Sequence, residues 1–125
     1  MAERFETEST KLSSANSVTD VYTPANTDSS DDRSVVLSVL AANTDGTNSV
    51  DVSLFVTATG STSTTVATVE GEASSYYLAK TITIPADSSL EFVANKVVMD
   101  HGQKLRAYAS AGGDCEVTVS ALEIY

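Results

Sequence analysis

The feature that most constrains the fold is a proline corner between two alternating stretches, at residues 76–92 (YYLAKTITIPADSSLEF). Four apolar residues before the proline share one parity: Tyr76, Leu78, Ile82 and Ile84. Because successive side chains of a strand point to opposite faces, this parity predicts a strand with one apolar face. Pro85 has no backbone N–H to give a ladder, so the chain turns there, either as a hairpin or as a corner between sheets. Lys80 interrupts the apolar parity, which indicates a bulge or a lysine whose ammonium reaches the rim.

A second region predicts a β-hairpin at residues 34–57. Residues 34–42 (SVVLSVLAA) are almost continuously apolar and rich in valine, which favours a central strand covered on both faces. Asp45-Gly46 is a strong hairpin turn signal, and clean alternation follows over residues 49–57.

The remaining strand signals are short. They lie at residues 18–23, 66–69, 96–99, 104–109 and 115–125. Pro24 ends the first of them, which suggests an edge strand. The pattern of about eight strands, with no helical periodicity, predicts an all-β fold, a single antiparallel β-sandwich or jelly roll. A chain of 125 residues with 42% hydrophobic content suits one core, assigned to residues 17–125.

Residues 1–16 are polar apart from Phe5 and Leu12. Lone apolar residues in a polar segment contribute little stability unless a neighbour buries them, so we expect an extended N-terminal arm that docks on another subunit, with a frayed terminus as the alternative. Tyr77 is a further candidate, because adjacent Tyr76 and Tyr77 point to opposite faces of a strand and one ring stays outside the core. Tyr108 lies on the polar parity of its strand and completes the candidate interaction residues.

The net charge of −10 argues against a nucleic-acid partner, since an acidic surface repels phosphates. The same charge fits either docking on a basic partner or simple solubility. The N-terminal segment lacks an apolar core, and no apolar run is long enough to span a bilayer. We therefore expect a protein made in the cytoplasm, with no membrane partner.

The sequence contains no recognisable catalytic motif. The single histidine, His101, lies in a turn, and no motif supplies the nucleophile and the orienting carboxylate that a catalytic base needs. The single cysteine, Cys115, shares its parity with core valines and predicts a small buried hydrophobe. The sequence thus predicts neither enzyme activity nor a cofactor.

An acidic loop is the one stretch that resembles a hard-cation site. It contains Asp28, Asp31 and Asp32, but it lacks the mid-loop glycine and distal glutamate of an EF-hand. A solvated acidic loop is the simpler interpretation, and no metal is assigned.

Several segments resemble one family of small β-sandwich virion proteins of tailed bacteriophages, in particular marine phages and cyanophages. The segments are VTDVYTPAN, SVVLSVLAAN, YYLAKTITIPADSSLEF and KVVMDHGQKLRAYASAGGDCEVTVSALEIY, all within residues 18–125. The resemblance implies binding rather than catalysis. It suggests a homo-oligomeric capsid decoration (cement) protein located in the virion, which binds and stabilises the shell of the major capsid protein. A neck, collar or tail component is the alternative, and a carbohydrate- or calcium-binding receptor module is a further one.

Overall fold

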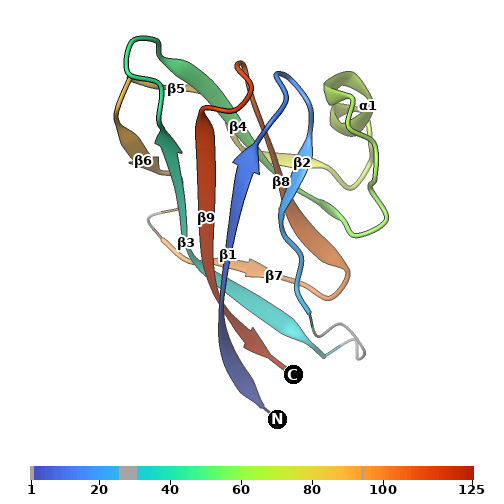
Figure 1. Cartoon of the computed structure of the whole chain (residues 1–125). Coiled ribbons are helices and arrows are strands. Elements are labelled where there is room, and N and C mark those ends of the chain that lie inside the picture. Colours follow the sequence, from blue (N-terminus) through green and yellow to red (C-terminus); the bar gives the residue numbers. More distant parts are fainter. Residues whose placement is uncertain (1, 26–30, 94) are drawn as a thin grey trace.

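The computed structural model describes residues 2–25, 31–93 and 95–125, which form two antiparallel sheets packed face to face (Figure 1). The first sheet runs in the order β1 (Glu3–Leu12), β9 (Cys115–Ile124) and β3 (Arg33–Asn43). Two short strands, β6 (Ser89–Glu91) and β7 (Val97–Met99), pair with β3 on its far side. The second sheet has the order β2 (Thr19–Tyr22), β8 (Gln103–Ala109), β4 (Val50–Ala58) and β5 (Tyr76–Ile84). The predicted all-β sandwich is confirmed.

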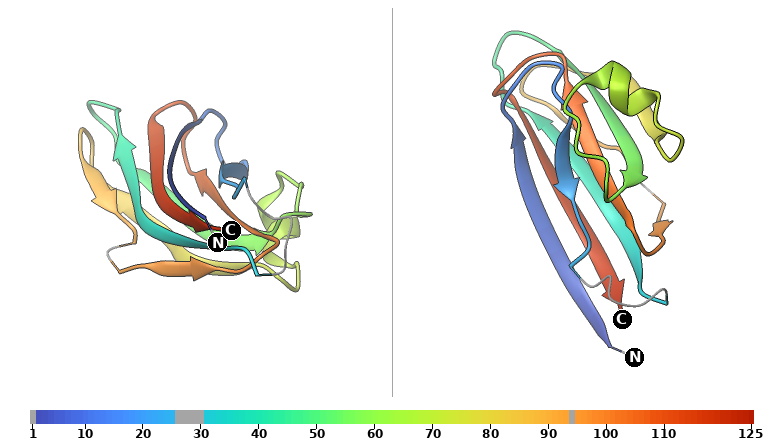
Figure 2. Two further views of the ribbon diagram at one scale, coloured as in Figure 1. Left: turned by 90° about the horizontal axis from the view of Figure 1, so that it is seen from below. Right: turned by 90° about the vertical axis from the view of Figure 1, so that its right-hand side faces the viewer.

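The core lies between the two sheets, where alternate residues of each strand are buried. Strand β9 shows this most clearly, because every second residue from Cys115 to Glu123 is buried and the residues between them are partly exposed. The sheets are strongly curved, and the two views of Figure 2 show β1 and β9 side by side along one flank. Burial of one face per sheet is the main source of stability in such a sandwich.

The predicted hairpin at residues 34–57 is wrong, because β3 and β4 lie in different sheets. The Asp-Gly signal was overridden by side-chain bonding in the connection. The Asn43 amide donates to the carbonyls of Asn48, Ile84 and Pro85, at 2.9–3.2 Å. The Asp45 carboxylate accepts hydrogen bonds from the backbone N–H groups of Thr47 and Asn48, which holds the pKa of Asp45 down to about 2. These bonds stabilise a crossing between the sheets rather than a tight turn.

Strand β3 is central, as predicted, but only one of its faces is fully covered. Val36, Val39 and Ala41 are buried in the core, whereas Leu40 is exposed on the outer face. The apolar run therefore does not indicate a strand covered on both sides. Its outward residues contribute instead to an exposed surface.

The proline corner is confirmed in its inter-sheet form, since β5 and β6 belong to different sheets. A bulge also explains Lys80. Val52 pairs with Ile82 and Leu54 pairs with Ala79, so Lys80 and Thr81 together oppose one residue. Thr81 has a φ of +48°, and its backbone N–H donates to Ser53 Oγ at 2.8 Å. Because of this bulge at a sheet edge, the predicted apolar face is not uniformly buried: Ile84 is fully buried, but Tyr76 is 66% exposed.

The predicted strand at residues 66–69 is instead a short helix, α1 (Val66–Glu70). The backbone N–H of Val69 donates to the carbonyl of Thr65 at 3.1 Å, which closes one helical turn. The turn buries Val69 completely in a small apolar cluster on the outer face of the second sheet. Three β-branched residues in this segment favour a strand. The helical turn forms instead because it lies over the second sheet and buries Val69 there.

The expected N-terminal arm at residues 1–16 is contradicted as well. Strand β1 pairs with β9 without a register shift from Glu3–Ile124 to Leu12–Cys115. Leu12 is fully buried in the main core and is therefore not an intersubunit contact. The described part of this segment belongs to the sandwich, so its removal would expose β9 and open the core.

Candidate interaction surfaces

An apolar row crosses the outer face of the first sheet. The ladder registers place Phe5 beside Leu122, Leu122 beside Val35, and Val35 beside Val98. Directly opposed residues on neighbouring strands share a face, so the four side chains form one row across β1, β9, β3 and β7. Phe5 is 75% exposed and Val98 is 63% exposed, while the two residues between them are half-buried.

Exposed apolar rows of this kind mark contact surfaces when their members are contiguous. Phe5 was predicted as an interaction residue, and its exposure fits that role. Leu122, Val35 and Val98 were not. The sequence signal was present at residues 115–125, where Leu122 and Ile124 occupy the parity opposite to the core residues. Only the ladder registers show that the side chains of this outward parity lie in one row with Phe5 and Val98.

The two predicted tyrosines are packed within the molecule. Tyr77 stacks on Phe55 with ring centroids 4.3 Å apart, and Lys80 Nζ lies 5.1 Å from its ring centroid. The hydroxyl of Tyr77 donates to the Glu70 carboxylate and lies 3.1 Å from the hydroxyl of Tyr108. Burial, followed by these hydrogen bonds, raises the pKa of Tyr77. Tyr108 is itself buried, so an exposed contact role for it is contradicted, and Tyr77 fastens α1 to the sheet rather than offering a free ring.

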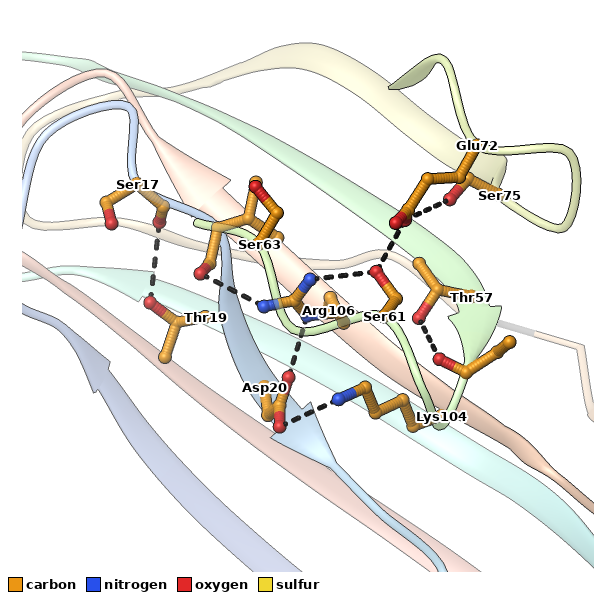
Figure 3. A network of polar contacts seen from close by, with 12 residues as sticks. Ser17, Thr19, Asp20, Thr57, Ser61, Ser63, Glu72, Ser75, Lys104 and Arg106 are labelled. Atoms are coloured by element: carbon orange, nitrogen blue, oxygen red, sulfur yellow. Dashed lines mark hydrogen bonds and ion pairs between the residues drawn. The ribbon is translucent and has the colours of Figure 1, made fainter. Parts of the chain in front are cut away.

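Two buried cations occupy the outer face of the second sheet, and Figure 3 shows both of them bonded to the carboxylate of Asp20. Lys104 is 4% exposed and Arg106 is 3% exposed. Arg106 Nε donates to Asp20 Oδ1 at 2.7 Å, and Lys104 Nζ donates to Asp20 Oδ2 at 3.1 Å. One carboxylate therefore holds both charges, which a buried cation requires.

The same guanidinium ties a surface segment to the sheet. Arg106 donates to Ser61 Oγ at 3.1 Å, and Ser61 donates to Glu72 Oε1 at 2.5 Å. The backbone N–H of Val18 also donates to the carbonyl of Thr64 at 2.9 Å. An open hollow of about 380 Å³ lies beside these groups, lined in part by Thr19, Thr62 and Thr64. Asp20 forms ion pairs with both Lys104 and Arg106. The hydrogen bonds of this network therefore have a structural role, which is to hold residues 59–75 against β8.

The residues considered for chemistry lie apart from one another. His101 is exposed in a turn, and Cys115 is fully buried, which raises the pKa of its thiol to about 11. The described residues contain no group of three potential metal ligands. Asp28 of the acidic loop lies outside the described residues, so the loop as a whole is not tested. In the described part of the chain, no helix has the length and apolar character needed to cross a bilayer.

Comparisons with known proteins identify no family for this chain. No protein-family model matches it, and no curated protein matches it. A solved Bacillus structure described as "Bacillus endospore appendages form a novel family of disulfide-linked pili" aligns with 96% of this chain and 86% of its own, at 15% identity and a TM-score of 0.47. This similarity is too low to assign a function.

Proposed function

We propose that this chain is a non-catalytic virion structural protein, a capsid decoration protein that docks the outer face of its first sheet on the major capsid protein. The observation that carries the proposal is the apolar row from Phe5 to Val98, which crosses a whole sheet of an acidic molecule. Burying such a row stabilises a contact without any catalytic group. The resemblance of several segments to phage virion proteins is the reason for proposing a phage capsid as the partner.

The acidic exterior supports this role in a second way. A net charge of −10 keeps the free subunit soluble before assembly and favours a basic acceptor surface. Many identical sites on a shell then make weak individual contacts effective together. The carbohydrate-binding alternative would need an exposed aromatic ring such as Tyr77 as a platform for the sugar. It gains no support, because that ring is stacked on Phe55.

Co-sedimentation of the purified protein with particles assembled without it tests the proposal. Val98→Glu places a charge at one end of the row and should abolish binding. Because Val98 is 63% exposed, the melting temperature should stay unchanged. Tyr76→Glu is the matched control: Tyr76 is equally exposed, at 66%, but lies on the other sheet, so its binding should equal that of the unmodified protein.

The site of binding decides between the two structural roles. A copy number comparable to that of the major capsid protein supports decoration, whereas a few copies at the connector or tail support the neck, collar or tail alternative. Failure of the unmodified protein to bind any part of the particle, or equal binding by Val98→Glu, would reject the proposed docking face.

A further inference from the structure

The backbone of β1 presents a row of hydrogen-bonding groups to its free side. Ala2 and Tyr125 exchange both of their backbone hydrogen bonds. In an antiparallel ladder, such pairs recur at every second residue. Arg4, Glu6 and Glu8 therefore bond toward β9, while the N–H and C=O groups of the odd residues point the other way. Within the described residues, no strand pairs with β1 on that side.

This edge differs from the other sheet edges. The ladders of β2 and β5 carry register shifts, and β6 and β7 are only three residues long. Bulges and short strands are common means by which proteins block edge-to-edge pairing. Strand β1 is ten residues long and has no register shift, proline or glycine. It is thus the long, regular edge of the molecule, suited to accept another strand.

We propose that the free edge of β1 pairs antiparallel with β1 of a second copy, about a two-fold axis at Phe5. In this register Arg4, which also pairs with Glu6 and Glu123 of its own chain, lies opposite Glu6 of the partner copy, and the symmetry makes that contact twice. Glu3 lies opposite Thr7 of the partner copy, so no like charges lie directly opposite each other. Registers centred on Glu6 or Thr7 instead oppose glutamate to glutamate, which destabilises a cross-strand pair.

The pairing also covers the large apolar side chain that is most exposed among the described residues. Phe5 is 75% exposed and ends the apolar row at the free edge. With Phe5 opposite its symmetry mate, the rows of the two copies join into one row across both sheets. Aromatic pairs in this position stabilise antiparallel ladders beyond their buried area. The inference does not depend on the proposed function, because it concerns the purified chain alone.

Analytical ultracentrifugation in about 0.15 M salt, which screens the repulsion between two acidic chains, tests the pairing. The unmodified chain should be a dimer. Thr7→Pro removes an outward N–H that bonds to Glu3 of the partner copy, but it leaves the bonds to β9 intact. We expect its dissociation constant to rise at least tenfold. Ser9→Pro removes an equivalent outward N–H, but it lies outside residues 3–7, the part of β1 that overlaps with β1 of the partner copy, so this variant should remain dimeric. A monomeric unmodified chain, or an equal effect of the two prolines, would overturn the proposal.

Cysteine cross-linking tests the register independently of proline tolerance. Hydrogen-bonded antiparallel pairs have Cα atoms about 5.5 Å apart, within the range that a disulfide spans. Phe5→Cys should therefore give a covalent dimer that a reducing agent dissolves. Ser9→Cys should not, because residues 9 of the two copies would lie about 27 Å apart at about 3.4 Å per residue. Cys115 is buried and adds no background. Equal cross-linking by both variants, or by neither, would refute the Phe5-centred pair.

Discussion

Asp20→Asn is the substitution that most directly tests how the second sheet is held together. Its carboxylate accepts hydrogen bonds from Arg106 Nε at 2.7 Å and from Lys104 Nζ at 3.1 Å. Both cations are almost fully buried, at 3% and 4% exposure. The asparagine keeps the shape of the side chain but removes its charge and turns one acceptor into a donor. Two buried cations then share a neutral partner.

The expected magnitude follows from the geometry. Breaking a buried ion pair by removing one partner costs about 3–5 kcal/mol, because the remaining charge stays desolvated. The Asp20 side chain is itself 47% exposed, so water can reach the site and partly solvate the cations. We therefore expect the lower end, about 3 kcal/mol of unfolding free energy, and a melting temperature lower by about 10 °C for a chain of this length.

Urea unfolding followed by circular dichroism measures the effect, with Asp100→Asn as the matched control. Asp100 pairs with Arg33 at 3.1 Å but is 71% exposed, so its loss should cost less than about 1 kcal/mol. Adding Lys104→Met to Asp20→Asn should recover about 1 kcal/mol or more, because one uncompensated charge is gone. If Asp20→Asn destabilises the protein no more than Asp100→Asn does, the buried-cation reasoning is wrong.

Three further substitutions or conditions give clear expectations. Thr81→Gly should be neutral or stabilising by up to about 1 kcal/mol, because it relieves a φ of +48°, whereas Thr83→Gly in the same strand should destabilise; urea unfolding compares them. Gly112→Ala should cost about 2 kcal/mol, since its Cβ would lie 2.8 Å from the carbonyl oxygen of Ser13, while Gly60→Ala, which meets nothing within 4 Å, should be neutral. The buried Cys115 thiol has a pKa of about 11 against an ordinary value of 9.0, so folding favours its protonated form. Its contribution is complete below pH 9 and is lost as the pH rises through 11; unfolding measured across this range, with Cys115→Ala as reference, should show that loss.

Part of this architecture follows from local chemistry that any strand obeys. Alternation at residues 115–125 predicts β9 and its buried face without further information. The missing backbone donor of Pro85 likewise predicts that the chain turns there, and the mismatched parity of Lys80 marks an irregularity in the strand. These features depend on residues next to one another in the chain, so the sequence alone locates them, but the structure selects the inter-sheet corner and the bulge.

Other features depend on partners that are distant in the chain. Asp45-Gly46 is a hairpin signal, yet the amide of Asn43 bonds to the carbonyls of Ile84 and Pro85 and directs the chain to the other sheet. Leu12 appears isolated in a polar segment, but pairing with β9 carries it into the core. Lys104 and Arg106 resemble solvent-facing residues until residues 59–75 cover them.

The candidate interaction surfaces also combine features that the sequence shows with features that only the structure shows. The sequence by itself determined that the chain is an acidic all-β domain without a recognisable catalytic motif, and it singled out Phe5, because composition and two-residue periodicity are local properties. Only the tertiary structure decided that Phe5 continues into Leu122, Val35 and Val98, and that β1 is an open edge. Strand order and register arise from long-range pairing across the sandwich, and no local pattern specifies which strands become neighbours.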